Sequence, residues 1–385
     1  MYLEVGFWIC VGLIAYIYVG YPACVFLIST IFGRNVKRAM IQPTVTVVIS
    51  AYNEESEIEA TVVNKLNQEY PPDLLKVVVV SDGSTDRTDE IVRNLAQRYG
   101  NRLVFVRQDP RQGKTQAMNF AMQHSTSDVV VFADANSIYA GDAIQELVSN
   151  FADPSVGYVT GQMVYGNPGE AGIGAGSSSY MSYENTLRML ESKLGSVVGV
   201  DGGIDAVLRH CYIPMRVDQL PDFVLPLSVV EQGKRVVYEP RARVFEMALS
   251  DSSKELRMRV RVSLRSLWAL FDKRSLFNPF RYPLFGWQVL SHKALRYTAF
   301  VPLAGLLLIN CVIWNKHWIY SSILSLQLSG YLTAALGYFL RKTAGVPSQA
   351  LVPCYFVILN LACVIACAKF LRGEKIVLWT PRVGT

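Results

Sequence analysis

Charged residues are missing from long parts of this 385-residue chain, in which 18% of residues are charged and 51% are hydrophobic. Four stretches contain no Asp, Glu, Lys or Arg: residues 5–33, 297–315, 318–340 and 344–368. The charge is therefore concentrated in the rest of the chain, at the density of an ordinary soluble domain, about 25%. This distribution excludes a single water-soluble globule and a carrier built mainly of spanning helices, and the apolar content excludes intrinsic disorder.

Each uncharged stretch is long enough to cross a bilayer, which takes roughly 20 helical residues. The first has no basic segment before it and exceeds the apolar part of a signal peptide, about 7–15 residues, so we expect a retained anchor. Arg34, Lys37 and Arg38 follow it, and the positive-inside rule places the next part of the chain in the cytoplasm. Three further crossings would place the C-terminus outside, although Lys369 and Arg372 favour the inside. The C-terminal topology stays open.

Cysteine and histidine are few, and their spacing is not typical of metal sites. The chain has 7 cysteines and 4 histidines, contains no CxxC pair, and places only Cys211 outside the uncharged stretches. Reduced, structural cysteines are consistent with a cytoplasmic central domain. The basic residues cluster at the membrane edges, so nucleic acid is not an expected partner.

Apolar, β-branched segments alternate with helical patterns in the first half of the charged region. The strand-like segments are residues 44–50, 76–80, 103–106 and 128–133, and the helical ones are 57–67, 88–98 and 115–123. This alternation predicts an α/β fold with a parallel sheet covered on both faces. Ligands of such sheets bind beyond the carboxyl ends of the strands.

Polar clusters follow three of these strands: AYNEE at 51–55, SDGSTD at 81–86 and DAN at 134–136. Turns and helix caps favour the same residue types, which is the alternative interpretation. Asp82 and Asp134 at adjacent strand ends would repel each other unless a cation or a sugar-base donor paired with them. Such an oxygen-rich site suits Mg²⁺ or Mn²⁺ bound through carboxylates and substrate phosphates.

The series AYNEE, SDGSTD, QGKTQAMN, ADAN and PDFVLPLSVVEQG resembles the family 2 glycosyltransferases with a GT-A fold. It is most similar to the membrane-embedded cellulose, chitin, hyaluronan and poly-N-acetylglucosamine synthases, over residues 44–297. Each motif alone is weak, but five in this order are specific. The resemblance implies an α/β GT-A nucleotide-sugar-binding domain with a mixed, mostly parallel sheet, plus transmembrane and interfacial helices.

The resemblance assigns donor-binding residues to the strand ends. Tyr52 and Asp82 match positions that hold the uracil of a UDP-sugar in this family, and Glu54 lies in the same donor-binding motif. Lys114 matches a lysine that helps to bind the nucleotide.

The family's metal-binding DxD motif falls on Asp134 and Asn136. The resemblance therefore implies Mg²⁺ or Mn²⁺ as cofactor, bound together with the diphosphate. Asn136 in place of the second Asp keeps an oxygen ligand but loses one charge, so metal affinity should fall.

Asp222 matches the family's catalytic base, with Pro221 in place of a second acid. A positioned carboxylate can take the proton of a sugar hydroxyl as it attacks the anomeric carbon, and the diphosphate leaves with its charge neutralised. One displacement inverts the anomeric centre, so an α-linked UDP-sugar would give a β-linkage. The alternative is that Asp222 only caps a helix over residues 223–232.

Acceptor contacts are implied at two places. Asp201 and Gly202 match the family's glycine-rich acceptor turn, and the segment ending at Tyr297 resembles the QxxRW motif with Lys293 and Tyr297 in place of Gln and Trp. Arg296 would bind the donor diphosphate, and Tyr297 would stack on the acceptor sugar. The alternative is a juxtamembrane basic cluster with an interfacial tyrosine.

Residues 179–193 predict a helix with Glu184, Arg188 and Glu191 on one face, either a solvated ion-pair face or a support for the acceptor channel. Residues 254–274 predict a basic amphipathic helix that lies on an anionic membrane surface or packs against the catalytic domain. The expected organisation is an anchor at 1–33, a cytoplasmic GT-A domain at 34–250, interfacial helices at 251–296, transmembrane helices at 297–371 and a tail at 372–385.

These features favour a multi-pass cell-membrane protein that is an inverting, metal-dependent glycosyltransferase. It would use a UDP-sugar to extend and export a β-linked polysaccharide, in contact with membrane lipids and with a possible accessory export subunit. One alternative is single-sugar transfer to a lipid, lipid-phosphate or lipid-linked acceptor. Another class is a nucleotide-sugar-binding regulatory subunit without activity, which the residues at 136, 221, 293 and 297 motivate. A pure transporter would leave the strand-end cluster without a purpose.

Overall fold

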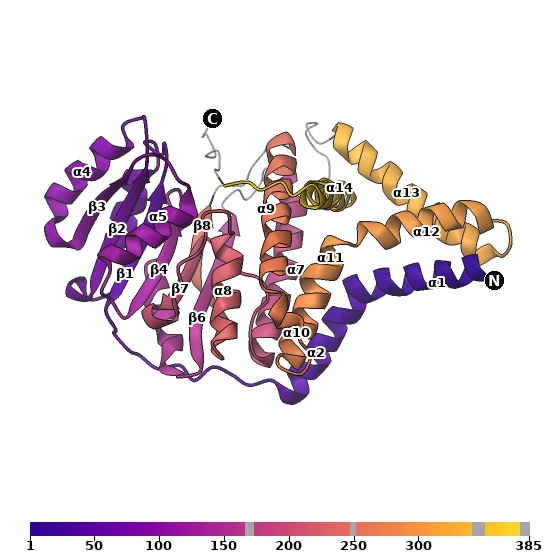
Figure 1. The fold of residues 1–385 in the computed structure, drawn as a ribbon, viewed down its shortest axis with the longest axis horizontal. Coiled ribbons are helices and arrows are strands. Elements are labelled where there is room, and N and C mark those ends of the chain that lie inside the picture. Colours follow the sequence, from indigo (N-terminus) through magenta and orange to yellow (C-terminus); the bar gives the residue numbers. More distant parts are fainter. Residues whose placement is uncertain (166–172, 247–251, 341–350, 378–385) are drawn as a thin grey trace. The chain divides into compact units, whose positions relative to one another are not determined.

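A computed structural model describes residues 1–165, 173–246, 252–340 and 351–377, and divides into two compact units (Figure 1). One unit holds the N-terminal helices, the first part of the long helix α7 (Ile173–Leu194) and the helices from α9 onward. The other holds all the strands of the described residues with the helices between them. The units are described separately below.

The strand-containing unit is built on an eight-stranded sheet of order β3-β2-β1-β4-β7-β6-β8-β5. Strands β3, β2, β1 and β4 are mutually parallel, β7 runs antiparallel to β4 and β6, β8 is parallel to β6, and β5 is antiparallel to β8. The predicted mixed, mostly parallel sheet is therefore confirmed. The strands are β1 Val45–Ala51, β2 Leu75–Asp82, β3 Leu103–Gln108, β4 Val129–Asp134, β5 Ile138–Tyr139, β6 Val156–Tyr165, β7 Ile204–Leu208 and β8 Arg235–Glu246.

Continuous apolar runs put the parallel strands in the centre of the fold. The side chains of β1 are buried along its whole length, and Val47, Val77 and Val131 pack in one core cluster. Such strands are buried on both faces because helices connect them. The helices of this unit are α3 Ile58–Leu66, α4 Thr88–Tyr99, α5 Lys114–Ala121, α6 Ala143–Val148 and α8 Pro221–Glu231.

The strand order reverses direction at β1, which lies between β2 and β4. The chain leaves β1 for β2 on one side and later enters β4 on the other. Because the three strands are parallel, their carboxyl ends lie at the same edge of the sheet. In the register, Ala51 is paired with Ser81, and Ser50 with Asp134. This arrangement carries the predicted polar clusters to a single edge of the sheet.

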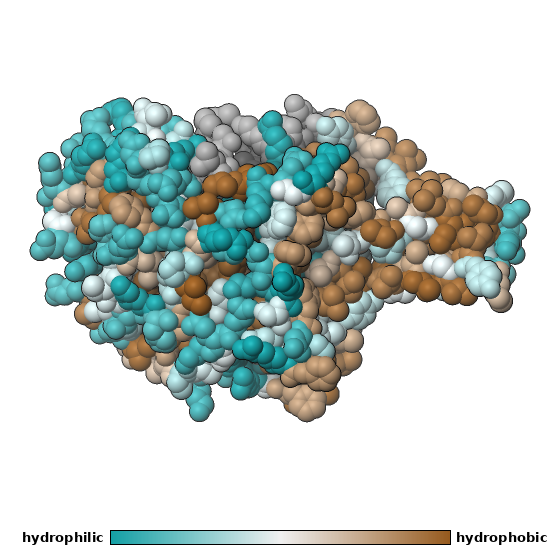
Figure 2. Space-filling view, in the orientation of Figure 1, coloured by the Kyte–Doolittle hydropathy of each residue, from teal (hydrophilic) through white to brown (hydrophobic). Residues whose placement is uncertain are grey.

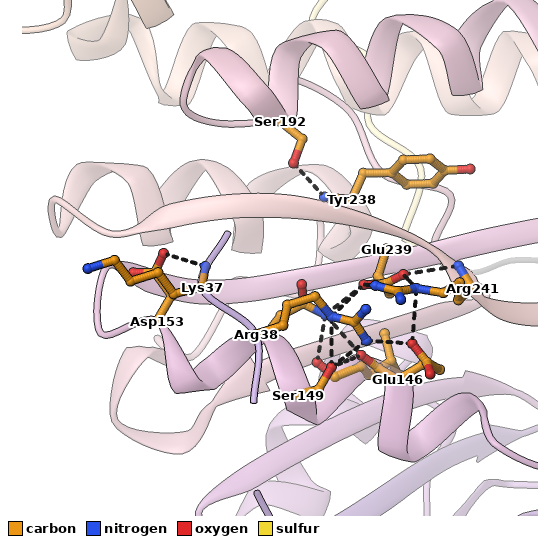
Figure 3. A network of polar contacts seen from close by, with 11 residues as sticks. Lys37, Arg38, Glu146, Ser149, Asp153, Ser192, Tyr238, Glu239 and Arg241 are labelled. Carbon is orange, nitrogen blue, oxygen red and sulfur yellow. Dashed lines mark hydrogen bonds and ion pairs between the residues drawn. The ribbon is translucent and has the colours of Figure 1, made fainter. Parts of the chain in front are cut away.

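The segment before β1 is tied to the sheet unit by a polar network (Figure 3). Arg38 contacts Glu146 at 2.5 Å and Glu239 at 3.1 Å, and also donates to the hydroxyl of Ser149. Arg241 lies 2.9 Å from Glu239 and 3.2 Å from Glu146. One of the basic residues that predict membrane orientation therefore holds the linker against the domain.

The other unit consists of helices in the described residues. Three helices are long and apolar enough to span a membrane: Tyr2–Phe32, Trp318–Leu340 (α13) and Val352–Leu371 (α14). The predicted stretch at 297–315 instead forms α12 (Phe300–Ile313). This helix is long enough to span a membrane only when it is taken together with the preceding segment Pro283–Tyr297, and the chain bends by 55° between the two. The first span comprises α1 Tyr2–Ala15 and α2 Tyr21–Phe32, and this unit also contains α9 Ser252–Asp272, α10 Pro283–Val289 and α11 Leu295–Tyr297.

The surface differs between the two units. In Figure 2 the atoms over α1, α12 and α13 are mainly brown, hydrophobic, whereas those over the sheet are mainly teal. Large apolar side chains are exposed on α1, α12 and α13, including Trp8, Leu308 and Leu332. A surface of this kind is stable against lipid and not against water.

Helix α9, predicted as an amphipathic interfacial helix, packs against α14. Leu264 and Arg265 are buried, and Arg259 joins Glu255 at 2.8 Å and the hydroxyl of Tyr355 at 2.6 Å. Much of its polar face is therefore used within this unit.

Candidate active site

Asp82 lies at the carboxyl end of β2 and is fully buried. Its Oδ1 accepts hydrogen bonds from the backbone N–H of Gln112 at 2.8 Å and the amide of Gln108 at 2.5 Å. Its Oδ2 accepts from the N–H of Gly113 at 2.9 Å and lies 3.5 Å from Nε of Arg111. Because a carboxylate offers about four acceptor sites, Asp82 holds the loop that leads into α5, and a donor base would have to displace one of these contacts.

Tyr52 follows β1 and is covered by a cation. The guanidinium carbon of Arg111 lies 3.4 Å from the centroid of the Tyr52 ring, a distance at which cation–π attraction is strong. Glu54 is fixed through its backbone N–H, which donates to the hydroxyl of Thr88 at 2.8 Å. Tyr52, Glu54 and Asp82 thus belong to one edge of the sheet, and a base stacking on this face of Tyr52 has to move Arg111.

Lys114 joins two carboxylates that are far apart in the sequence. Its Nζ lies 2.7 Å from Oδ1 of Asp134, at the end of β4, and 3.5 Å from Oδ1 of Asp222, in the first turn of α8. Burial alone would lower the pKa of Lys114, but Asp134 and Asp222 raise it above its ordinary value. The carboxylates of two predicted site residues, one for the donor and one for the acceptor, therefore meet around the ammonium group of a third.

Gly202 explains how the chain comes so close to Asp222. A Cβ atom added to Gly202 would lie 2.5 Å from Cγ of Asp222, and its φ is +84°. Only glycine satisfies both conditions without strain. Helix α8 begins at Pro221, its N-cap residue is Leu220, and Asp222 lies in its first turn.

Asp201, which was predicted to contact the acceptor, forms an ion pair with Arg188. Arg188 binds it with two nitrogens, at 2.6 and 2.7 Å, and both side chains are nearly buried. Arg188 also donates to the carbonyl of Gly199 at 3.0 Å. This bidentate ion pair fixes the glycine-rich turn and leaves little of the Asp201 carboxylate for a ligand.

Asp205 is a site residue that the sequence reasoning missed. It lies in β7, on the opposite face from the core residues Ile204 and Ala206, and is buried. Among the residues that the structure describes, its Oδ1 has no hydrogen-bond partner. Burial, with a further contribution from Asp222, raises the pKa of Asp205 to about 8. An acid inside the apolar run IDAVL was the signal in the sequence.

Arg296 lies in the helical unit, in a buried charge cluster. It contacts Glu184 at 2.5 Å, with Lys293 at 3.6 Å and His292 at 3.3 Å from the same carboxylate. Burial would raise the pKa of Glu184, but Arg296, Lys293 and His292 hold it well below its usual value. The interpretation of this face of α7 as solvated is wrong, since Glu184 is only 2% exposed.

Tyr297 ends α11 and is half-buried. The ring that lies near Arg296 belongs to Tyr183, at 5.1 Å from the guanidinium carbon. Tyr297 keeps its predicted acceptor role as a proposal.

Asp134 and Asn136 were predicted to bind a metal, and both are half-buried at the end of β4. They offer one carboxylate and one amide oxygen. Within the described part of the chain, no three His, Cys, Asp or Glu residues form a group able to hold a metal ion. Mg²⁺ often binds through one or two carboxylates plus substrate phosphates, so this pair fits a cation that arrives with a diphosphate and competes with Lys114 for Asp134.

Parts of the chain are similar to known proteins. Residues 46–209 match the model of the Glycosyl transferase family 2 family. Poly-beta-1,6-N-acetyl-D-glucosamine synthase of Staphylococcus aureus is 26% identical over 203 residues, 51% of this chain and 48% of that protein. The probable glycosyltransferase YdaM of Bacillus subtilis is 34% identical over 123 residues, 31% of this chain and 29% of that protein. The match thus spans about half, or less, of the length of these relatives.

The fold also has a solved counterpart. The mannosyltransferase PcManGT from Pyrobaculum calidifontis, determined with GDP-Man and Mn²⁺, aligns with a TM-score of 0.71 at 23% identity, over 96% of this chain and 99% of that one. This similarity establishes a shared fold, a mixed α/β fold that resembles those of GT-A glycosyltransferases. The family match indicates a glycosyltransferase family 2 domain within residues 46–209.

Proposed function

We propose that the chain is a membrane-integrated, inverting glycosyltransferase that moves a sugar from a UDP-sugar to a growing β-linked polysaccharide. The observation that carries the proposal is the bridge made by Lys114 between Asp134 and Asp222. It supports a reaction centre where the donor diphosphate and the acceptor hydroxyl lie side by side.

Asp222 acts as the general base. Its carboxylate accepts the proton of an acceptor hydroxyl while that oxygen forms a bond to the anomeric carbon of the donor. The bond from the anomeric carbon to the diphosphate oxygen breaks, and UDP leaves with the electron pair. Because a single displacement occurs at this carbon, its configuration inverts.

Lys114 and the strand ends bind the departing diphosphate. The ammonium of Lys114, released from Asp134 by the substrate, neutralises negative charge as it develops on the phosphate. A divalent cation held by Asp134 and Asn136 would stabilise the same charge. Tyr52, Glu54 and Asp82 bind the nucleoside, Arg296 the diphosphate, and Gly202 with Tyr297 the acceptor.

The apolar helices support a membrane location with the catalytic domain in the cytoplasm. Three helices of sufficient length, at Tyr2–Phe32, Trp318–Leu340 and Val352–Leu371, flank the domain in the sequence. The proposal includes export of the polymer through the membrane, with or without an accessory subunit. The polysaccharide synthase similar to this chain supports polymer extension, and the proposal commits to it.

Purified membranes containing the protein test the proposal. We expect UDP release from one member of a panel of UDP-sugars, in the presence of Mg²⁺ or Mn²⁺, and a product of high molecular weight after prolonged incubation. GDP-mannose is assayed separately, by release of GDP, because the mannosyltransferase of similar fold was solved with it, and transfer from GDP-mannose alone would contradict the UDP-sugar donor. A single-sugar lipid product would contradict polymer extension, and release from no donor would contradict the enzyme itself.

A further inference from the structure

Lys65 is a buried lysine outside the catalytic roles described above. It lies on α3 with 0% of its surface exposed. Its Nζ donates to the carbonyl of Ser137 and, at 3.1 Å, to the amide oxygen of Asn64. The same atom lies 3.8 Å from the centroid of the Tyr139 ring. A buried ammonium is costly without such partners, so the three contacts define what this lysine holds.

The segment that Lys65 contacts is the continuation of the strand end that carries Asp134. Asn64 accepts from the backbone N–H of Tyr139 at 2.8 Å and donates to its carbonyl at 3.0 Å. The hydroxyl of Ser137 in turn donates to the carbonyl of Asp134 at 2.9 Å. Residues 134–139 are therefore fixed both internally and from α3.

Tyr139 extends this connection to the other side of the site. Its hydroxyl lies 3.1 Å from the carbonyl of Phe132 and 3.1 Å from that of Gly203. Gly203 follows Gly202, which packs against Asp222. One continuous set of contacts thus runs from Lys65 to the backbone carbonyl of Asp134, at the end of β4, and to the turn beside the proposed base.

The charges around Lys65 match this placement. Burial lowers the pKa of Lys65 to about 7, while Glu246 and Asp134 favour its charged form.

We propose that Lys65 is a positioning residue that holds the loop of residues 134–139 so that Asp134 and Asn136 can bind a divalent cation with the donor diphosphate. The proposal rests on the proposed function for the identity of that ligand. Ligand groups must be held within about 0.5 Å of their productive positions. Mutation of residues that orient metal ligands typically lowers metal affinity 10–100-fold.

The test compares Lys65→Met with Lys76→Met, a lysine of β2 that is exposed, in the full-length protein. Amide hydrogen exchange is measured without ligands, and Mn²⁺ binding is measured by electron paramagnetic resonance in the presence of UDP. For Lys65→Met we expect exchange at least tenfold faster in residues 134–140, unchanged exchange in β1 and β2, and Mn²⁺ affinity at least tenfold lower. Lys76→Met should behave as the unmodified protein.

Unchanged exchange or unchanged Mn²⁺ affinity in Lys65→Met overturns the positioning role. Equal acceleration throughout the sheet also overturns it, because Lys65 would then support the domain as a whole. If Lys65→Met does not fold, Asn64→Ala, which removes both bonds to the Tyr139 backbone, must give the same local effect. Absence of sugar transfer by the unmodified protein would refute the proposed function while leaving the exchange result to decide the role of Lys65.

Discussion

At the scale of single residues, the close approach of Gly202 and Asp222 gives a direct test of the site geometry. Gly202→Ala places a methyl group 2.5 Å from Cγ of Asp222 at a φ of +84°. Gly233→Ala is the matched control, because Gly233 has a φ of +77° with no atom within 4 Å of the added Cβ. Both substitutions carry the left-handed strain of about 1 kcal/mol.

We therefore expect comparable losses of thermal stability from strain, but a loss of transfer activity of at least tenfold in Gly202→Ala alone. Activity and melting temperature measured on both variants check this. Equal activity in the two would show that Asp222 does not need its present position.

The buried acid Asp205 predicts a dependence of stability on pH. Its pKa is about 8 in the folded protein and about 4 in an unfolded chain. Because the unfolded state loses this proton first, the free energy of unfolding falls as the pH rises from 4 to 8 and levels off above. Asp205→Asn removes this contribution, so its advantage in melting temperature should grow between pH 5 and pH 8, to roughly 5 °C or more.

Thermal unfolding of Asp205→Asn at several pH values measures that difference. Asp73→Asn is the control, since Asp73 is exposed and its replacement should leave the pH profile unchanged. A pH-independent difference between Asp205→Asn and the unmodified protein would refute an uncharged Asp205.

At the scale of elements, the network around Arg38 connects the linker to α6 and β8. Glu239 is 3% exposed at its side chain and Arg38 is one of its ion-pair partners. Arg38→Met leaves Glu239 with two partners, Arg241 and the amide of Asn150. We therefore expect the free energy of unfolding to fall by about 1–3 kcal/mol, which is below the usual cost of breaking a buried ion pair.

Thermal unfolding compares Arg38→Met with Lys37→Met, whose side chain is exposed and which contacts Asp153 through its backbone N–H. Lys37→Met should be nearly neutral. Equal stability of the two variants would mean that the linker is held by its backbone alone.

The sequence was sufficient to predict elements whose pattern is local. The strands β1, β2 and β4 can be recognised in the sequence, because burial on both faces requires a continuous run of apolar residues. The polar residues that follow each run mark the strand ends. The start of α5 at Lys114 lies one residue before the prediction, since Gly113 with its φ of 95° forms the turn.

Long-range pairing could not be predicted in the same way. Glu184 and Arg296 are 112 residues apart in the sequence. The helical spacing of α7 does not show whether Glu184 is paired with a distant arginine or exposed to solvent. Lys65 likewise lies among apolar residues of α3, and its partners on the 134–139 segment follow only from the position of β5. The roles of the site residues remain predictions that the experiments above test.

At the scale of the whole molecule, the chain combines a soluble-type α/β domain with helices suited to lipid. The apolar stretches were predicted from the absence of charge, and three of them form helices of spanning length. The stretch at 297–315 instead contains the 14-residue helix α12. This helix is about 21 Å long, shorter than a hydrocarbon core of about 30 Å, and composition alone does not predict where it begins and ends.

The most direct test of the account is the transfer rate and the UDP affinity of Asp222→Asn, measured on one preparation. The amide keeps the shape of the side chain and loses its basicity, so we expect the rate to fall about 10²–10⁴-fold while UDP binds within about twofold of the unmodified affinity. Asp73→Asn should change neither quantity. An Asp222→Asn variant that binds UDP and transfers sugar at the unmodified rate would contradict the assignment of the base.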